Sequence, residues 1–251
     1  MKKLFLILML LFCATTFAAE IDLRFENANQ IYRSGGYDKA SKIYEEILAQ
    51  GYESPELYYN LGNCYYKLNN LPAAILQFER ARKLRPQDED IAHNLTLANL
   101  RTEDRIEPIP DLFFINWWRK WTELASADQW AVIGLVSLWL ALCMIIGIFY
   151  IYRSLLIRRI FSITAILAFL LFLISFLAAI ERHKIMENHK FAIVFSPSTD
   201  VKSAPDAQST GLFVLHSGVK VELIDRVGDW NKVRLADGKV GWMQSSNFKI
   251  I

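Results

Sequence analysis

Two long apolar runs dominate the hydrophobic pattern of the chain, at residues 130–151 and 160–180, and neither contains a charged residue. A helix of about 20 residues is long enough to cross the hydrocarbon layer of a bilayer. Only residues 152–159 separate the two runs. The pattern therefore predicts two transmembrane helices in a tight antiparallel hairpin, with both long flanking segments on the same side of the membrane.

The charges around this hairpin predict its orientation. The loop carries Arg153, Arg158 and Arg159 without an acidic residue, whereas the flanks at residues 119–128 and 181–184 mix both signs. Short loops rich in arginine and lysine lie on the cytoplasmic side of a membrane. We therefore expect the loop in the cytoplasm and both flanking segments on the opposite side.

Residues 1–18 have the pattern of an export signal. Two lysines precede an apolar stretch at residues 4–12, and the small-residue region ends in a site suited to an export peptidase. We expect cleavage after Ala18. Retention of the stretch as a third anchor stays open, and lipid modification of Cys13 is disfavoured because a bulky phenylalanine precedes it.

Residues 19–107 carry a helical pattern that repeats every 34 residues, with small or apolar residues at the matched positions. The matched pairs are Ala28 with Gly62, Ile31 with Tyr65, Tyr32 with Tyr66, Tyr37 with Leu71, Ala40 with Ala74, Tyr44 with Phe78, and Ile47 with Ala81. Gly35-Gly36 and Asn69-Asn70 are expected to form the turns between the two helices of each copy.

The second copy resembles a tetratricopeptide repeat. The residues that carry the resemblance are Leu61-Gly62, Tyr65, Ala74, Phe78, Ala81 and Pro86. The first copy is a looser match and lacks the final proline. The resemblance implies a solenoid of antiparallel helix pairs, and residues 88–105 are expected to form a last helix that caps the stack.

The first helices of such pairs form a concave groove, which is the candidate surface for a partner. Its predicted residues are Asn29, Tyr32, Arg33, Asn63, Tyr66, Lys67 and Arg101. The three cations are spaced by 34 residues, and two of them follow an asparagine by four residues. The resemblance implies that such asparagines and cations clamp extended segments or C-terminal carboxylates. The alternative is that the cations only complement the dipoles of helix ends.

Residues 108–129, between the repeats and the hairpin, form a segment rich in aromatic side chains. Pro108 and Pro110 argue against a helix in this segment. The rings that follow belong to Phe113, Phe114, Trp117, Trp118 and Trp121. Because tryptophan favours the headgroup zone, we expect the segment to lie at the membrane interface; an aromatic cage for a ligand is the alternative.

After a linker at residues 181–188, the pattern at 189–251 changes to short alternating segments with turn signals, which predicts an all-β barrel. The segment resembles the bacterial SH3 family. The residues that carry this resemblance are Ala204-Pro205, Leu215-His216-Ser217-Gly218, Gly228-Asp229-Trp230, Asp237-Gly238 and Gly241-Trp242. Trp230 and Trp242 either line a ligand surface or close the core of the barrel.

Groups suited to catalysis or metal binding are scarce in the sequence. No HExxH, GxSxG or P-loop pattern occurs, and His216 has no carboxylate or cysteine at a usable spacing. His183 and His189 lack nearby cysteines. We therefore expect no catalytic residue, no metal site and no cofactor.

Three further features exclude other classes of protein. The cysteines at 13, 64 and 143 lie in different predicted segments, so they cannot form a disulfide framework. The apolar runs contain no ionisable residue, which disfavours a transporter or channel. The net charge is only +2 without a basic tract, so nucleic acid is not an expected partner.

The predicted fold class is a multi-domain membrane protein with an all-α tetratricopeptide solenoid, two transmembrane helices and an all-β SH3-like barrel. This order of segments resembles the BatE-type proteins of bacterial aerotolerance operons. The resemblance implies a non-enzymatic scaffold at the bacterial inner membrane, with the repeats and the SH3 domain in the periplasm and other Bat-type envelope proteins as partners. The alternative is a cell-wall module whose SH3 domain binds peptidoglycan and whose repeats recruit a wall enzyme.

Overall fold

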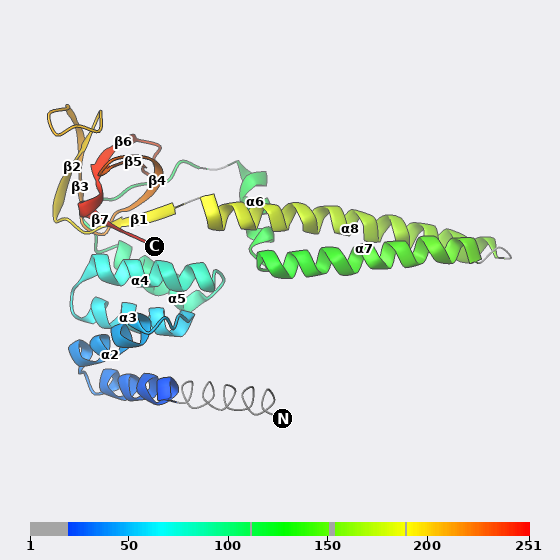
Figure 1. The fold of residues 1–251 in the computed structure, drawn as a ribbon, viewed down its shortest axis with the longest axis horizontal. Coiled ribbons are helices and arrows are strands. Elements are labelled where there is room, and N and C mark those ends of the chain that lie inside the picture. Colours follow the sequence, from blue (N-terminus) through cyan, green and yellow to red (C-terminus); the bar gives the residue numbers. More distant parts are fainter. Residues whose placement is uncertain (1–19, 111, 151–153, 189) are drawn as a thin grey trace, which may run out of the picture. The chain divides into compact units, whose positions relative to one another are not determined.

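The structure is a computed structural model that describes residues 20–110, 112–150, 154–188 and 190–251 (Figure 1). It comprises two compact units: the first joins the chain up to Ile109 with Phe191–Ile251, and the second is Pro110–Lys190. The expected signal segment and its cleavage site lie outside the described residues. The second unit is therefore an insertion into a body that is built from both sides of it.

The repeats of the first unit consist of helices that begin and end at local sequence signals. They span residues 20–33, α2 (Tyr37–Ala49), α3 (Pro55–Lys67), α4 (Leu71–Leu84) and α5 (Glu89–Asn99). At the start of α3 the side chain of Ser54 accepts a hydrogen bond from the backbone N–H of Leu57 at 3.1 Å. Gly35 (φ 86°) and Asn69 (φ 60°), one period apart, adopt the left-handed conformation that turns the chain between paired helices.

The core of the repeats is formed by the positions that recur in the sequence. Tyr44 and Phe78 are fully buried between successive helices. A Cβ atom at Gly62 would lie 2.7 Å from the ring of Phe78, so any side chain at this position would force the two helices apart. The predicted all-helical repeat region is confirmed.

The last helix of the repeats is shorter than expected, because α5 ends at Asn99 instead of continuing to Arg105. The following segment crosses the C-terminal β domain (residues 190–251). The side chain of Ile106 packs against the core of that domain, and the N–H of Ile109 donates to the carbonyl of Ala236 at 3.1 Å. Ile106 continues the helical spacing of apolar residues in the sequence, but its contacts with the β domain, a distant part of the chain, hold it outside the helix.

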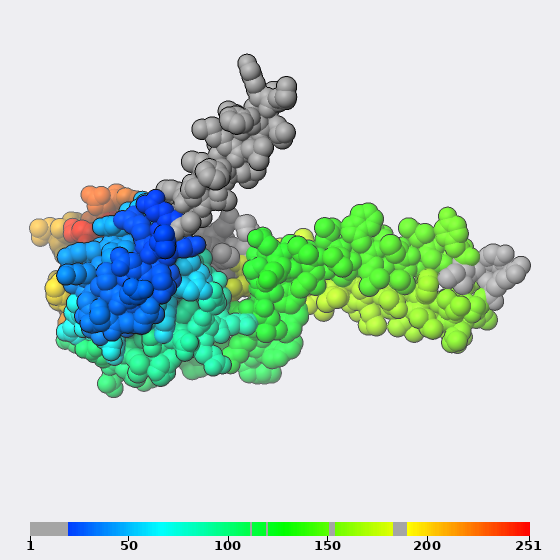
Figure 2. Space-filling model, turned by 90° about the horizontal axis from the view of Figure 1, so that it is seen from below, coloured from blue at the N-terminus to red at the C-terminus, as the bar shows by residue number. Residues whose placement is uncertain are grey.

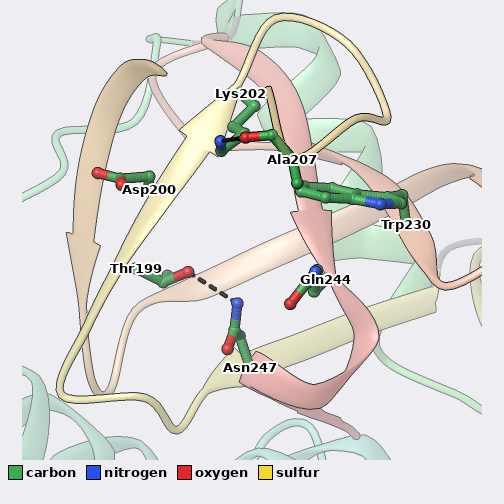
Figure 3. Close-up of a pocket in the computed structure, with 7 residues that line it drawn as sticks. All are labelled: Thr199, Asp200, Lys202, Ala207, Trp230, Gln244 and Asn247. Atoms are coloured by element: carbon green, nitrogen blue, oxygen red, sulfur yellow. Dashed lines mark hydrogen bonds between the residues drawn. The ribbon is translucent and has the colours of Figure 1, made fainter. Parts of the chain in front are cut away.

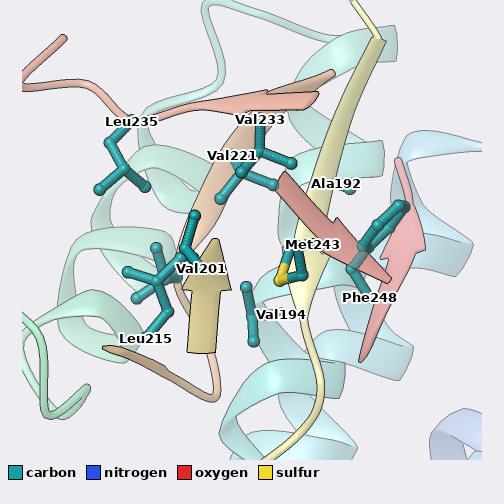
Figure 4. Close-up of a cluster of buried hydrophobic side chains, with 10 residues drawn as sticks. Ala192, Val194, Val201, Leu215, Val221, Val233, Leu235, Met243 and Phe248 are labelled. Atoms are coloured by element: carbon teal, nitrogen blue, oxygen red, sulfur yellow. The ribbon is translucent and has the colours of Figure 1, made fainter. Parts of the chain in front are cut away.

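The β domain is an antiparallel sheet in the strand order β3-β2-β6-β5-β4-β1-β7. Its elements are β1 (Lys190–Val194), β2 (Ser198–Lys202), β3 (Gly211–His216), β4 (Lys220–Val227), β5 (Trp230–Arg234), β6 (Val240–Gln244), a 3₁₀ turn (Ser245–Asn247) and β7 (Phe248–Ile250). The core residues are Ala192, Val194, Val201, Leu215, Val219, Val221, Val233, Leu235, Met243 and Phe248 (Figure 4). The predicted hairpin turn at Asp237-Gly238 is present, with the N–H of Leu235 donating to the carbonyl of Lys239 at 2.9 Å.

Helix α4 of the repeats packs against the β domain. Residues 73–79 of α4 are all buried, which a helix with one face in solvent cannot achieve. Strand β1 covers part of the helix. Its residues Ala192 and Val194 face the core of the β domain, whereas Ile193, with 0% of its surface exposed, joins the cluster that contains Ile75. Both faces of β1 are therefore buried, one in each domain.

A buried ion pair lies at the same contact. Glu79, whose side chain is 6% exposed, accepts hydrogen bonds from Nη2 of Arg82 at 2.6 Å and from Nζ of Lys220 at 2.8 Å. Burial lowers the pKa of the Lys220 ammonium, and the neighbouring carboxylate of Glu79 opposes that shift. Removing Glu79 would leave the Lys220 ammonium without its counter-charge in the contact, so these groups favour a single docked arrangement.

The second unit contains α6 (Phe113–Thr122), α7 (Ala127–Tyr150) and α8 (Leu155–Asn188). Helices α7 and α8 run side by side along their length (Figures 1 and 2). By length and composition, α7 and residues Leu155–Arg182 of α8 could each cross a membrane, and an 18-residue stretch in each has a mean hydropathy of 2.7 and 2.8, respectively. A Cβ atom at Gly147 of α7 would lie 2.5 Å from the ring of Phe161 of α8, so this glycine allows close packing of the two helices.

Three boundaries in this unit differ from the expectations. Residues 113–122 are helical, because Pro108 and Pro110 precede the helix and do not interrupt it. Helix α8 includes Leu155–Arg159 of the expected loop and the expected linker at 181–188, since no glycine or proline ends it before Asn188. Arg153 of the loop lies outside the described residues.

His216 has carboxylate partners that its local sequence did not indicate. Its Nδ1 lies 2.9 Å from Oδ1 of Asp104, its Nε2 lies 3.5 Å from Oε1 of Glu103, and its N–H donates to Oδ2 of Asp104 at 2.7 Å. The expectation that His216 lacks a usable carboxylate is therefore wrong, because Asp104 is 112 residues away in the sequence. The hydrogen bond that the imidazole ring donates to the carboxylate of Asp104 raises the pKa of His216.

We expect this contact to make the stability of the first unit depend on pH. Because the folded state raises the pKa of His216, the stabilisation is complete below the unfolded value of about 6.5 and is lost as the pH rises through the folded value. The melting temperature of the detergent-solubilised protein should thus fall more steeply between acidic and mildly alkaline pH in the wild type than in Asp104→Asn. The exposed His93 provides the control, since His93→Gln should keep the wild-type profile. Identical profiles for the wild type and Asp104→Asn would contradict the prediction.

Candidate binding surfaces

The predicted groove residues lie along the last turns of the first helices. Arg33 ends the helix over residues 20–33, Lys67 is the last residue of α3, and Arg101 follows the end of α5 by two residues. All three side chains are exposed. These positions do not distinguish partner binding from complementing the helix dipole, because residues at the C-terminal ends of these helices also line the predicted groove.

Asn29 is engaged inside the repeat stack. Its Oδ1 accepts hydrogen bonds from the hydroxyl of Tyr44 at 2.6 Å and from Nδ2 of Asn60 at 2.9 Å, and its Nδ2 donates to Glu26 at 3.1 Å. Burial raises the pKa of Tyr44, so its hydroxyl stays protonated and needs an acceptor. Asn29 therefore satisfies a buried hydroxyl and joins two successive repeats.

Asn63 occupies the matched position in the second copy and makes one of the same contacts. Its Oδ1 accepts a hydrogen bond from Nδ2 of Asn94 at 2.8 Å, and Asn94 lies 34 residues after Asn60. Phe78 replaces Tyr44 at the matched position of this copy, so no hydroxyl requires Asn63. The recurring asparagines thus have a structural cause, hydrogen bonding from one repeat to the next, that the sequence interpretation missed.

The three cations differ in their surroundings. Nη2 of Arg33 pairs with Oε1 of Glu26 at 3.0 Å, and hydrogen bonds from Asn29 and Arg33 lower the pKa of that carboxyl. Nη2 of Arg101 donates to Oδ1 of Asn69 at 2.6 Å, and its guanidinium carbon lies 4.9 Å from the ring centroid of Tyr66. Lys67 is exposed and has no ion-pair or hydrogen-bond partner within the part of the chain that the structure describes.

The unengaged donors of the surface therefore centre on the end of α3. The NH₂ group of Asn63 also makes no hydrogen bond to a described residue, and it lies one helical turn before Lys67. Tyr66 lies beside them, half-buried and held by the guanidinium of Arg101. Tyr32, its counterpart in the first copy, instead packs edge-on against Tyr37 at 5.1 Å between ring centroids.

A second surface lies on the outer face of strands β2, β6 and β5. Trp230 and Trp242 are half-buried there, and neither belongs to the core cluster in Figure 4. The interpretation that they close the core is wrong. The neighbouring residues Gly241 and Met243 face inward instead, because side chains alternate across a strand. Lys232 lies directly opposite Trp242 in the sheet.

A shallow hollow of about 250 Å³ adjoins Trp230 on this face (Figure 3). It is lined by Thr199, Asp200, Lys202, Ala207, Trp230, Gln244 and Asn247. Nδ2 of Asn247 donates to the hydroxyl of Thr199 at 2.8 Å, and Nζ of Lys202 donates to the carbonyl of Ala207. The hollow thus combines one aromatic ring with several fixed polar groups. Apart from Trp230, the sequence offered no signal for these residues, because they come from separate strands and loops.

The described residues contain no cluster of histidine, cysteine and acidic side chains that could hold a metal ion. Cys64 is fully buried, and burial raises the pKa of its thiol to about 12. A buried, protonated thiol is a poor nucleophile and behaves as a small apolar side chain.

Comparison with protein-family models assigns two parts of the chain. A tetratricopeptide repeat model matches residues 26–89, and a bacterial SH3 domain model matches residues 197–249. A comparison with curated proteins finds no match to the chain. These matches confirm the predicted tetratricopeptide region and the predicted bacterial SH3 domain. Both domain types are typically non-catalytic binding modules.

The two asparagines should differ in their effect on stability. Asn29→Ala would leave the buried hydroxyl of Tyr44 without its acceptor and should lower the free energy of unfolding by about 1–3 kcal/mol. Asn63→Ala should lower it by less than about 1 kcal/mol, because Asn94 keeps its hydrogen bond to the hydroxyl of Tyr59 at 2.9 Å.

Urea unfolding followed by circular dichroism measures this difference, and Tyr44→Phe supplies the matched control. In a Tyr44→Phe background Asn29→Ala should lose much of its effect, because no hydroxyl then needs an acceptor. Equal effects of Asn29→Ala in both backgrounds would show that Asn29 does not act through Tyr44.

Proposed function

We propose that the protein is a non-enzymatic, membrane-anchored adaptor whose repeats hold an extended, acidic segment of a partner protein. The observation that carries the proposal is a pair of donors, Lys67 Nζ and the Asn63 NH₂ group, which have no partner among the described residues; Lys67 is exposed, and the half-buried Asn63 lies one helical turn before it on α3. Arg101 and Tyr66 flank them. The carboxylates of a bound segment would receive charge-assisted hydrogen bonds from Lys67 and Arg101, while the amide of Asn63 would donate to the segment's backbone.

Arg33 has a smaller role in this proposal than Lys67. Its guanidinium is already paired with Glu26, so a ligand carboxylate would have to displace that contact. Asn29 has no role in binding, because its amide forms hydrogen bonds to Tyr44, Asn60 and Glu26. The acidic segment would therefore bind mainly between α3 and the end of α5.

Contacts within the first unit support the proposed membrane topology. Glu79 contacts Lys220, and Asp104 contacts His216, so residues before the hairpin pack against residues after it. Both regions must then lie in one compartment, which requires an even number of membrane crossings between them. Helices α7 and α8 meet that requirement as an antiparallel transmembrane pair.

The export-type N-terminus and the arginine-rich loop favour the periplasm for the first unit and the cytoplasm for the loop. The chain would then be a two-span protein of the bacterial inner membrane, with the signal at 1–18 removed. The order of its segments resembles that of BatE-type proteins. Other Bat-type envelope proteins are accordingly the partners that we propose for the repeats.

A second function, binding of cell-wall peptidoglycan, is favoured by the hollow beside Trp230. The hollow lies on strands β2, β5 and β6, whereas Ile193 of β1, Lys220 and His216 contact the chain before the hairpin, so among the described residues that docking does not use the lining of the hollow. An aromatic ring beside amide, hydroxyl and charged groups suits sugars and short peptides. Sedimentation with purified wall that is lost in Trp230→Ala and kept in Lys67→Ala would support this function.

Replacing the cations beside α3 should abolish partner capture without unfolding the protein. Each exposed charge contributes only about 0–1 kcal/mol to folding, so the Lys67→Ala/Arg101→Ala variant should keep its melting temperature. Crosslinking in intact cells, followed by purification and mass spectrometry, should recover the Bat-type partners with the wild type and lose them with the variant. Lys39→Ala/Lys83→Ala changes the charge equally at exposed positions of α2 and α4 and should retain them. Recovery of the same partners by both variants would place the binding surface elsewhere.

A reporter that fluoresces only in the cytoplasm tests the topology. It should be bright when fused after Ser154, between the two spans, and dark when fused after Ile251. The reason is that the arginine-rich loop resists translocation, whereas an even number of crossings returns the chain to its starting side. The opposite pattern would reverse the proposed location and exclude the periplasmic partners.

A further inference from the structure

Helix α6 is fixed to the start of α7 by tryptophan contacts. Nε1 of Trp130 donates to the carbonyl of Thr122 at 2.9 Å, and Thr122 is 0% exposed. The ring centroids of Trp121 and Trp130 lie 4.5 Å apart, and Trp118 stacks on Trp121 at 5.4 Å. Within the second unit, α6 therefore has a defined position against α7.

The rest of the aromatic side of α6 remains uncovered in this unit. Phe113, Phe114 and Trp117 are 85%, 52% and 66% exposed. They lie within one helical turn of one another, so they form a continuous apolar edge, which we call the aromatic edge. An exposed apolar patch of this kind on a fixed helix indicates a surface that a membrane or another protein covers.

The position of α6 along the chain identifies what covers the aromatic edge. Residues 123–126 alone separate α6 from α7, and four residues reach at most about 14 Å. The side chain of Ser126 and that of Gln129 exchange hydrogen bonds with each other's backbone N–H, which fixes the start of α7. If α7 enters the hydrocarbon layer at this point, α6 must lie at the depth of the lipid headgroups, where tryptophan is most favourable.

We infer that α6 lies in the plane of the membrane, with Phe113, Phe114 and Trp117 inserted at the boundary between headgroups and acyl chains. Lys120, exposed on the same helix, would contact lipid phosphates. This inference rests on the proposed membrane anchoring by α7 and α8. It assigns α6 a function of its own, which is to fix the depth and rotation of the hairpin through lipid contacts.

The test measures the depth of single fluorescent labels in the full-length protein. Cysteines introduced by Phe113→Cys, Trp117→Cys, Asn116→Cys or Val136→Cys are labelled with the polarity-sensitive NBD dye in a Cys13→Ser/Cys143→Ala background. Cys64 is left in place because it is fully buried. Each labelled protein is reconstituted into phosphatidylcholine vesicles that carry nitroxide quenchers either near the headgroup or near the end of the acyl chain.

The labels at 113 and 117 should lose most of their fluorescence to the shallow quencher and little to the deep one. The label at 116, on the polar side of α6, should be quenched by an aqueous quencher instead. Equal aqueous quenching at 116 and 117, while the label at 136 responds to the deep quencher, would overturn the inference and leave the anchoring intact. A label at 136 that is accessible only from water would overturn the anchoring and, with it, the inference. Two positions on the aromatic edge keep the test valid if one substitution disturbs the fold.

Discussion

The contact between helix α4 and strand β1 is the constraint on which the first unit depends. Ile193 enters the core of the repeats while Ala192 and Val194 enter the core of the β domain, so one strand completes two cores. The ion pair of Glu79 with Lys220 lies beside this apolar contact and requires both partners once it is dehydrated. Repeat stacks need an end that protects their last helix pair, and in this chain the bacterial SH3 domain covers α4.

This docking has a consequence for the rest of the molecule. Because the two halves of the first unit are separated in the sequence by residues 110–190, the inserted helices must leave the body and return to it. An anchor that begins and ends in one compartment satisfies that condition. The tryptophans at 118, 121 and 130 join α6 to α7 within this insertion.

In the candidate groove, the same residue type has different surroundings at matched positions. Asn29 is used by the hydroxyl of Tyr44, whereas Phe78 frees Asn63 from that task. The cations also differ, since Arg33 forms an ion pair with Glu26, whereas Lys67 has no acidic partner among the described residues. The polar surface of the repeats is thus asymmetric, and its available donors lie towards the second repeat.

Local sequence determined the elements of this protein. The 34-residue period predicted the repeats, the apolar runs predicted α7 and most of α8, and the turn at Asp237-Gly238 predicted a hairpin of the SH3 domain, because periodicity and turn chemistry act over a few residues. Only the tertiary structure decided the end of α5, the outward position of Trp242, the partner of His216 and the use of Asn29. Each of these depends on residues that are not neighbours in the chain: Asn29 contacts Tyr44 and Asn60 only once the repeats have stacked, and Asp104 contacts His216 only once the two domains have packed together.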